Sequence, residues 1–117
     1  MPTIQFEKPV VLSRGQRFAD KSVAVRSGEL FVDFGYPFVL DGKVCSGFDA
    51  KPCQLPVRFT SAKGHFTRAD LARLVRKKYI DLFRSDRHEA FHRPEDLVIE
   101  GMEKKGRAKL WRLNVSS

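Results

Sequence analysis

The sequence predicts an α+β fold, in which short, mostly antiparallel strands and hairpins are covered by one long amphipathic helix near residues 67–84. Two observations predict this class. Short apolar runs separated by glycine and proline fill the first half, and apolar residues at helical spacing follow a capping signal in the second half. The length of 117 residues, 42% of them hydrophobic, predicts a single domain, 1–117, with a core rich in its ten phenylalanines.

The first strands are expected at residues 4–6 and 10–12, on either side of a proline that suits a strand edge or start. Residues 22–26 and 30–34 are two further apolar runs with Ser-Gly-Glu between them. This spacing predicts a hairpin in which Gly28 supplies the positive φ of the turn.

A second hairpin signal joins residues 37–40 to residues 43–45 through Asp41-Gly42, a dipeptide typical of tight type I′ turns. Residues 46–56 contain a glycine and two prolines and are expected to form a loop. One more short strand is expected at residues 57–59.

The helix has the clearest signals. Thr67 is expected as N-cap and Asp70 as the third helical residue, an acidic version of the capping box, with Phe66 packing on Leu71. At 100° per residue, seven apolar side chains share one arc: Leu71, Ala72, Leu74, Val75, Tyr79, Leu82 and Phe83. This arc is expected to be core. Lys78 falls inside it and is expected to pack its stem while its ammonium reaches water.

The chain after the helix predicts one more hairpin. Pro94-Glu95-Asp96 suits a short helical turn, because proline is tolerated at a helix start and acids favour that end. Strands are expected at residues 97–102 and 108–115, with Trp111 as a core anchor.

A resemblance rests on this half of the chain. Residues 67–72 (Thr-Arg-Ala-Asp-Leu-Ala) continue to 79–83 (Tyr-Ile-Asp-Leu-Phe), and a histidine-containing connection leads to 95–101 (Glu-Asp-Leu-Val-Ile-Glu-Gly). This order resembles a group of small plant proteins of uncharacterised function. The resemblance covers the C-terminal half and implies no known site.

Charge is concentrated in the same half. The net charge is +8, of which residues 1–62 contribute +2 and residues 63–117 contribute +6. Such a field favours an acidic protein, a nucleic acid or another anionic partner, although a moderately basic solvated surface is the simpler interpretation. The N-terminus lacks the basic-then-apolar order of a signal peptide, and no apolar run approaches membrane length, so a cytoplasmic or nuclear protein without membrane contact is expected.

The candidate binding residues are cations of the helix and of the last hairpin, with one aliphatic residue at the border of the helical stripe: Arg73, Lys77, Ile80, Arg84, Lys104, Lys105 and Arg107. They favour a non-catalytic binding module with a protein-interaction or assembly role, and a homo-oligomer is one form of it. Ile80 favours this reading, because a polyanion gains little from an exposed aliphatic side chain. The alternative is nucleic-acid backbone binding through the basic helix face.

Several residues suited to metals or catalysis also fit plain surface roles. Cys45, Cys53, His88 and His92 could in principle provide four zinc ligands, but the spacing of the cysteines is too long for the usual motif, so free thiols and no metal are expected. Three charged residues could support a metal-dependent nuclease, the second alternative: Asp96, Glu103 and Lys105. No catalytic motif or cofactor fingerprint is present, so no cofactor is expected and the chain is more consistent with a protein that is not an enzyme.

Overall fold

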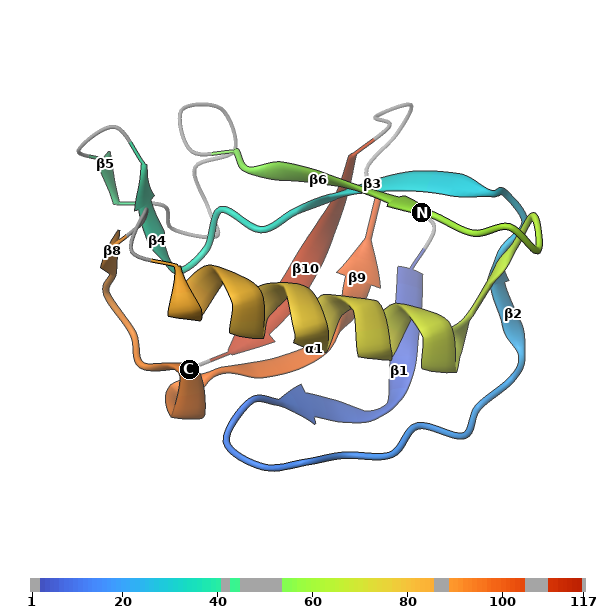
Figure 1. Ribbon diagram of the computed structural model, residues 1–117, viewed down its shortest axis with the longest axis horizontal. Coiled ribbons are helices and arrows are strands. Elements are labelled where there is room, and N and C mark those ends of the chain that lie inside the picture. Colours follow the sequence, from blue (N-terminus) through green and yellow to red (C-terminus); the bar gives the residue numbers. More distant parts are fainter. Residues whose placement is uncertain (1–2, 41–42, 45–53, 86–88, 105–109, 117) are drawn as a thin grey trace.

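Mostly antiparallel short strands form the sheets and a long helix covers the main sheet, as the sequence predicts for an α+β protein (Figure 1). The computed structural model describes residues 3–40, 43–44, 54–85, 89–104 and 110–116. In chain order the elements are β1 (Thr3–Val11), β2 (Val23–Val25), β3 (Glu29–Asp33), β4 (Phe38–Leu40), β5 (Lys43–Val44), β6 (Pro56–Thr60), β7 (Phe66–Thr67), α1 (Arg68–Arg84), β8 (Glu89–Ala90), the 3₁₀ turn η1 (Pro94–Asp96), β9 (Val98–Glu103) and β10 (Leu110–Ser116).

Five strands form the main sheet in the order β1-β9-β10-β3-β6. The pairs β1–β9, β9–β10 and β3–β6 are antiparallel, whereas β10 runs parallel to β3. A parallel pair needs a long crossover connection, and α1 lies within the segment that links β3 to β10. The last strand of the chain therefore lies between two earlier strands, and β1 and β6 form the two edges.

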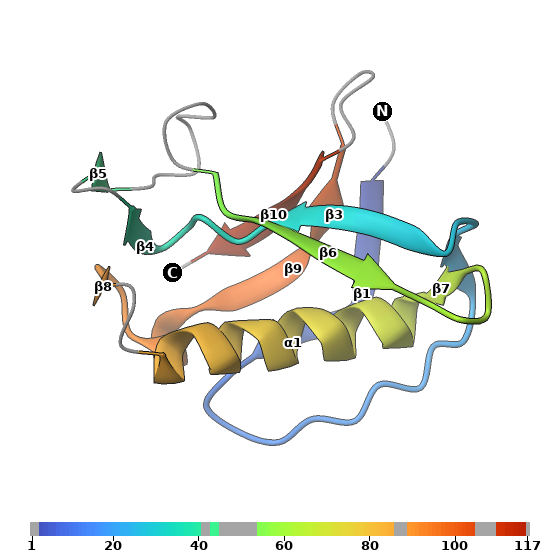
Figure 2. The same ribbon diagram turned by 45° about the horizontal axis from the view of Figure 1, so that its top comes forward.

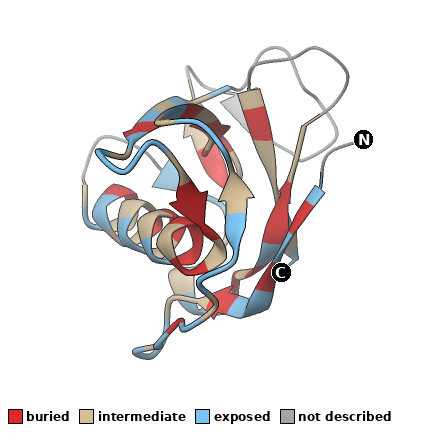
Figure 3. Ribbon diagram, turned by 90° about the vertical axis from the view of Figure 1, so that its right-hand side faces the viewer, coloured by how far each residue is buried: buried red, intermediate tan, exposed pale blue. Residues whose placement is uncertain are grey.

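Helix α1 lies across one face of this sheet, as Figure 2 shows. Its buried residues are Ala69, Leu71, Ala72, Val75, Tyr79 and Leu82. Opposite them, the sheet and its connections bury Ile4, Phe6, Val10, Leu30, Val32, Phe34, Phe59, Ile99, Met102 and Trp111. Figure 3 shows the helix beside the sheet, with buried positions on both. No helix in the described ranges combines the length and apolar character needed to cross a membrane.

The helix signals in the sequence are confirmed. Thr67 is the N-cap, its side-chain oxygen accepts a hydrogen bond from the N–H of Asp70, and the Asp70 carboxylate accepts the N–H of Thr67, each at 3.0 Å. The apolar arc is the buried face of the helix, but two of its residues, at its borders, are only half-buried. Leu74 and Phe83 are half-buried, because they lie where the helix surface turns away from the sheet. Lys78 is half-buried too.

Two predicted hairpins are confirmed. Strand β4 pairs with β5, although Asp41 and Gly42, the expected turn, lie outside the described residues. Strand β9 pairs with β10, and Trp111 is buried with 7% of its surface exposed. The 3₁₀ turn η1 occurs at Pro94, as expected.

The hairpin expected across Gly28 is wrong. Strand β2 pairs with β7, whereas β3 lies between β6 and β10. Among the described glycines a positive φ occurs at Gly64, not at Gly28. The reason is that the apolar alternation of β3 is satisfied by strands far away in sequence, which a local turn signal does not register.

Candidate functional site

The basic stripe expected on α1 consists of Arg73, Lys77 and Arg84, and all three are exposed, but they differ in what they already bind. Arg73 donates a hydrogen bond to the carbonyl oxygen of Phe18 at 3.0 Å and forms an ion pair with Asp70 at 3.2 Å. Lys77 and Arg84 form no hydrogen bond or ion pair with another described residue. Within the stripe, these two cations are therefore the ones available to a ligand.

Arg76, at the border of the stripe, is a structural residue. Its guanidinium donates to the carbonyl oxygens of Val11 at 3.2 Å and of Arg14 at 2.7 Å. Together with Arg73 it ties the segment after β1 to the side of the helix. Two of the helix's arginines therefore shape a surface as well as contribute charge to it.

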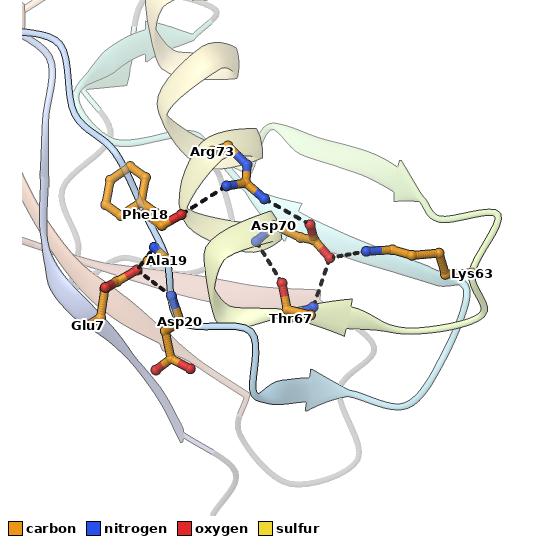
Figure 4. Close-up of polar contacts among 8 residues, drawn as sticks. All are labelled: Glu7, Phe18, Ala19, Asp20, Lys63, Thr67, Asp70 and Arg73. Atoms are coloured by element: carbon orange, nitrogen blue, oxygen red, sulfur yellow. Dashed lines mark hydrogen bonds and ion pairs between the residues drawn. The ribbon is translucent and has the colours of Figure 1, made fainter.

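Asp70 organises the first turn of α1 (Figure 4). Its carboxylate accepts from Thr67 and from the ammonium of Lys63 at 2.8 Å, and it pairs with Arg73. Partial burial by itself raises the pKa of this carboxyl, but the hydrogen bonds from Lys63 and Thr67 outweigh it and hold the pKa of Asp70 well below its usual range. Asp70 is therefore an ionised structural group with its charge already compensated.

A groove of about 270 Å³ lies between the end of β6 and the helix, and we call it the edge groove. Lys63, Arg73 and Lys77 supply cations, and Phe66 and Leu74 supply apolar surface. Its full lining is Thr60, Ser61, Lys63, Phe66, Asp70, Arg73, Leu74 and Lys77. Because Asp70 is engaged by Lys63 and Arg73, the free charge in this groove is that of Lys77.

A second groove, of about 380 Å³, lies between the helix and the segment that follows β1, and we call it the arginine groove. Three arginines and four apolar side chains contribute to it, and its lining is Leu12, Ser13, Arg14, Gly15, Arg76, Ile80, Phe83, Arg84 and Pro94. Ile80 is half-buried within this lining and does not project alone from the stripe. No carboxylate occurs among the described residues of the lining.

The sequence-predicted residues of α1 are thus divided between two sites. Arg73 and Lys77 line the edge groove, whereas Ile80 and Arg84 line the arginine groove. Sequence reasoning missed Leu12, Arg14 and Lys63, which come from the segments beside the helix. No local signal identifies these residues, because only the packing of the chain brings them to α1.

The basic cluster expected on the last hairpin does not join this surface in the described structure. Lys104 lies over the ring of Trp111, with its ammonium 5.4 Å from the ring centroid. In Figures 1 and 2, β9 starts near the C-terminal end of α1 and runs away from the helix, and Lys104 follows its last residue, Glu103. Lys105 and Arg107 lie outside the described residues.

No group of three metal-binding side chains occurs in the part of the chain that the structure describes. Cys45, Cys53 and His88 lie outside that part. Of the residues considered for a nuclease, Asp96 lies in η1 before β9 and Glu103 ends β9. A strand of this length spans about 20 Å, so these two carboxylates do not share one site.

An aromatic cluster near the C-terminal end of the helix was not anticipated. The rings of Tyr36, Phe91 and His92 lie within 4.8–5.8 Å of one another, and Phe91 is 39% exposed. Below them, the buried hydroxyl of Tyr79 donates to the carbonyl oxygen of Tyr36 at 2.9 Å. Burial raises the pKa of Tyr79 far above its usual value, with the charge of Asp33 acting in the same direction, so this phenol stays protonated and structural.

No family model, curated protein or solved structure matches this chain. The resemblance to small plant proteins stays a prediction. The chemistry of the two grooves is therefore the basis of the functional inference.

Proposed function

We propose that this protein is a non-catalytic binding module that docks an acidic, partly apolar segment of a partner protein in the arginine groove. The observation that carries the proposal is the composition of that groove. Leu12, Ile80, Phe83 and Pro94 provide apolar surface, while arginines and no described carboxylate accompany them. A ligand that fits both features has apolar side chains flanked by negative charge.

Two of the arginines are available for recognition. Arg14 and Arg84 are exposed, and no described residue accepts a hydrogen bond from their side chains. Arginine is suited to carboxylates, because its planar guanidinium donates two parallel hydrogen bonds. Arg76 contributes positive charge while it holds the wall of the groove in place.

The apolar part of the groove favours a protein partner over a nucleic acid. Phosphate-backbone binding depends on cations, and half-buried Ile80 and Phe83 add nothing to it. An apolar side chain of a peptide, in contrast, gains about 25 cal/mol for each Å² that it removes from water there. Nucleic-acid binding through Lys77 and Arg84 is the alternative that the experiment must separate.

The test uses a short capped peptide in which aspartates and glutamates flank leucine and phenylalanine, with affinity measured by calorimetry. We expect Ile80→Asp and the Arg14→Glu/Arg84→Glu double variant each to weaken binding by about tenfold or more, which corresponds to about 1.4 kcal/mol. Lys21→Glu, an exposed residue outside the groove, is the matched charge control and should bind like the original protein.

Equal affinity of the groove variants and Lys21→Glu for this peptide would contradict the proposal. Short RNA and DNA are titrated in parallel at low and physiological salt. Oligonucleotide binding with a steep salt dependence, lost in Lys77→Gln/Arg84→Gln but kept in Ile80→Asp, would replace the proposal with the nucleic-acid function. Self-association that Ile80→Asp abolishes would instead identify a second copy of the chain as the partner.

A further inference from the structure

The outer edge of β6 presents main-chain groups that pair with no strand in the part of the chain that the structure describes. The N–H of Ser61 donates to Gly28 at 2.8 Å at one end of the β3–β6 pair, and the N–H of Phe34 donates to Leu55 at 2.9 Å at the other. Hydrogen-bonded positions alternate along an antiparallel pair, so Pro56, Arg58 and Thr60 direct their main-chain groups away from β3. No described residue bonds to the outward N–H groups of Arg58 and Thr60.

The opposite edge of the sheet is covered. The carboxylate of Glu7 accepts from the N–H groups of Ala19 at 2.6 Å and Asp20 at 2.8 Å. The side chain of Gln16 accepts from the N–H of Val11 at 2.9 Å and donates to the carbonyl oxygen of Pro9 at 2.8 Å. The register of β1 also shifts between Gln5 and Val10. These contacts cover an edge strand, and β6 has no such cover among the described residues; its protection is limited to Pro56 at its start and the charged side chain of Arg58.

The edge groove lies directly beside the open edge. Thr60, the last residue of β6, and Ser61 line one side of it and α1 the other, so an extended peptide in this groove reaches the edge of β6 at Thr60, and Arg58 lies two residues further along the strand. Side chains of a strand alternate between two faces. Those on the helix side would meet half-buried Leu74 and the unpaired ammonium of Lys77.

We propose that β6 accepts an extended acidic segment of a partner protein as an additional antiparallel or parallel strand. Main-chain hydrogen bonds to Arg58 and Thr60 would supply register, and an alternation of apolar and acidic residues would fit Leu74 and Lys77. This is a second docking mode, separate from the arginine groove and independent of it.

Charge favours a foreign acidic segment over a second copy of this chain. Two copies of β6 paired antiparallel about Arg58 would place the two Arg58 side chains opposite each other, but each already forms an ion pair with Glu29 at 2.7 Å, so Arg58 does not decide between the two occupants. The deciding charge is that of Lys77, because Asp70 engages Lys63 and Arg73. Two copies would bring two unpaired Lys77 ammonium groups to the same edge, whereas an acidic residue of an added strand would pair with Lys77.

The first test measures the main-chain contacts. The probe is a capped peptide that alternates isoleucine and aspartate, and hydrogen exchange of the protein's amides is followed with and without it. We expect the exchange of the Arg58 and Thr60 amides to slow by about tenfold or more on saturation with peptide. The same peptide with alternate main-chain nitrogens methylated, which removes donors without changing side chains, should bind about tenfold more weakly than the parent.

The second test uses variants of the edge and the groove. Thr60→Pro removes an outward N–H that β3 does not use, and Thr60→Ala is its control; Lys77→Glu reverses the free charge, and Lys21→Glu is its control. We expect about tenfold weaker binding of the alternating peptide for Thr60→Pro and Lys77→Glu, with little change for the controls. Should Thr60→Pro unfold, the methylated peptide and the amide exchange decide the matter.

Unchanged exchange at Arg58 and Thr60 in the peptide complex, or equal binding of the methylated peptide, would overturn the proposal. Protection of these amides by self-association alone would assign the edge to a second copy. Binding of RNA in this groove without amide protection would also overturn it. Failure of the arginine-groove proposal is separable, because Arg14→Glu/Arg84→Glu affects that groove and leaves Lys77 and the β6 edge in place.

Discussion

Asp70 joins the cap of the helix to the charge of the edge groove. Its carboxylate, 21% exposed, receives hydrogen bonds from Thr67 and Lys63 and an ion pair from Arg73. Its pKa is lowered because these contacts outweigh its partial burial. A carboxyl whose pKa is lower in the folded than in the unfolded state stabilises the fold above the unfolded-state value, about 3.9 for aspartate.

The lowered pKa of Asp70 in the folded protein leads to a prediction. Asp70→Asn should lower the free energy of unfolding by about 1 kcal/mol at neutral pH, since it removes charge from contacts that are partly exposed to solvent. The difference from the original protein should be complete above about pH 5 and shrink as the pH falls below about 4. Urea unfolding at several pH values measures it. A difference that grows towards acid pH would mean that the Asp70 pKa is raised instead.

The hydrogen bonds of the helix arginines show which basic residues are free to bind a ligand. Arg73 and Arg76 donate to main-chain carbonyls at the end of β1 and in the segment that follows it, at Phe18 for Arg73 and at Val11 and Arg14 for Arg76. Replacing Arg73 therefore removes a structural hydrogen bond, whereas replacing a fully solvated residue of the stripe would change the stability little. Charge reversal at Lys77 or Arg84 tests recognition more cleanly.

Helix α1 has a buried face and two half-buried borders. Leu71 is fully buried, while Leu74 borders the edge groove. We expect Leu71→Ala to cost about 2–5 kcal/mol of stability, as buried leucine truncations do. Leu74→Ala should cost about 1 kcal/mol, because water already reaches this side chain. Urea unfolding compares the two variants. A larger loss of unfolding free energy for Leu74→Ala than for Leu71→Ala would mean that the buried face of the helix is assigned incorrectly.

At the scale of the whole molecule, the close approach of β1 to β9 depends on Gly101. Gly101 pairs with Gln5, and a Cβ atom at this position would overlap the carbonyl oxygen of Ile4. A main-chain atom cannot move aside without shifting the strand. The sheet therefore requires glycine here.

We expect Gly101→Ala to cost about 3 kcal/mol or more. Gly15→Ala is the matched control, because no atom lies within 4 Å of the Cβ that it adds, and it should change stability by about 0.5 kcal/mol or less. Thermal and urea unfolding measure both. Equal stability of the two variants would mean that β1 does not lie against Gly101 as described.

Features that neighbouring residues control follow from the sequence alone. Thr67 and Asp70 are three positions apart, so the capping box sets the start of α1 wherever the helix packs. The α+β class, the β4–β5 and β9–β10 hairpins and the burial of Trp111 follow in the same way from local pattern.

The strand partners and the two grooves, in contrast, depend on how distant segments pack together. Strand β3 pairs with β10, about eighty residues later, and the edge position of β6 results from that order. Alternation along a strand predicts which face is buried, but not which strand lies beside it. The division of the basic residues has the same origin, because carbonyls of the segment after β1 engage Arg73 and Arg76 and leave Lys77 and Arg84 to the solvent. Hydrogen bonds between distant segments carry no local sequence signal, so the two grooves could not be read from the chain alone.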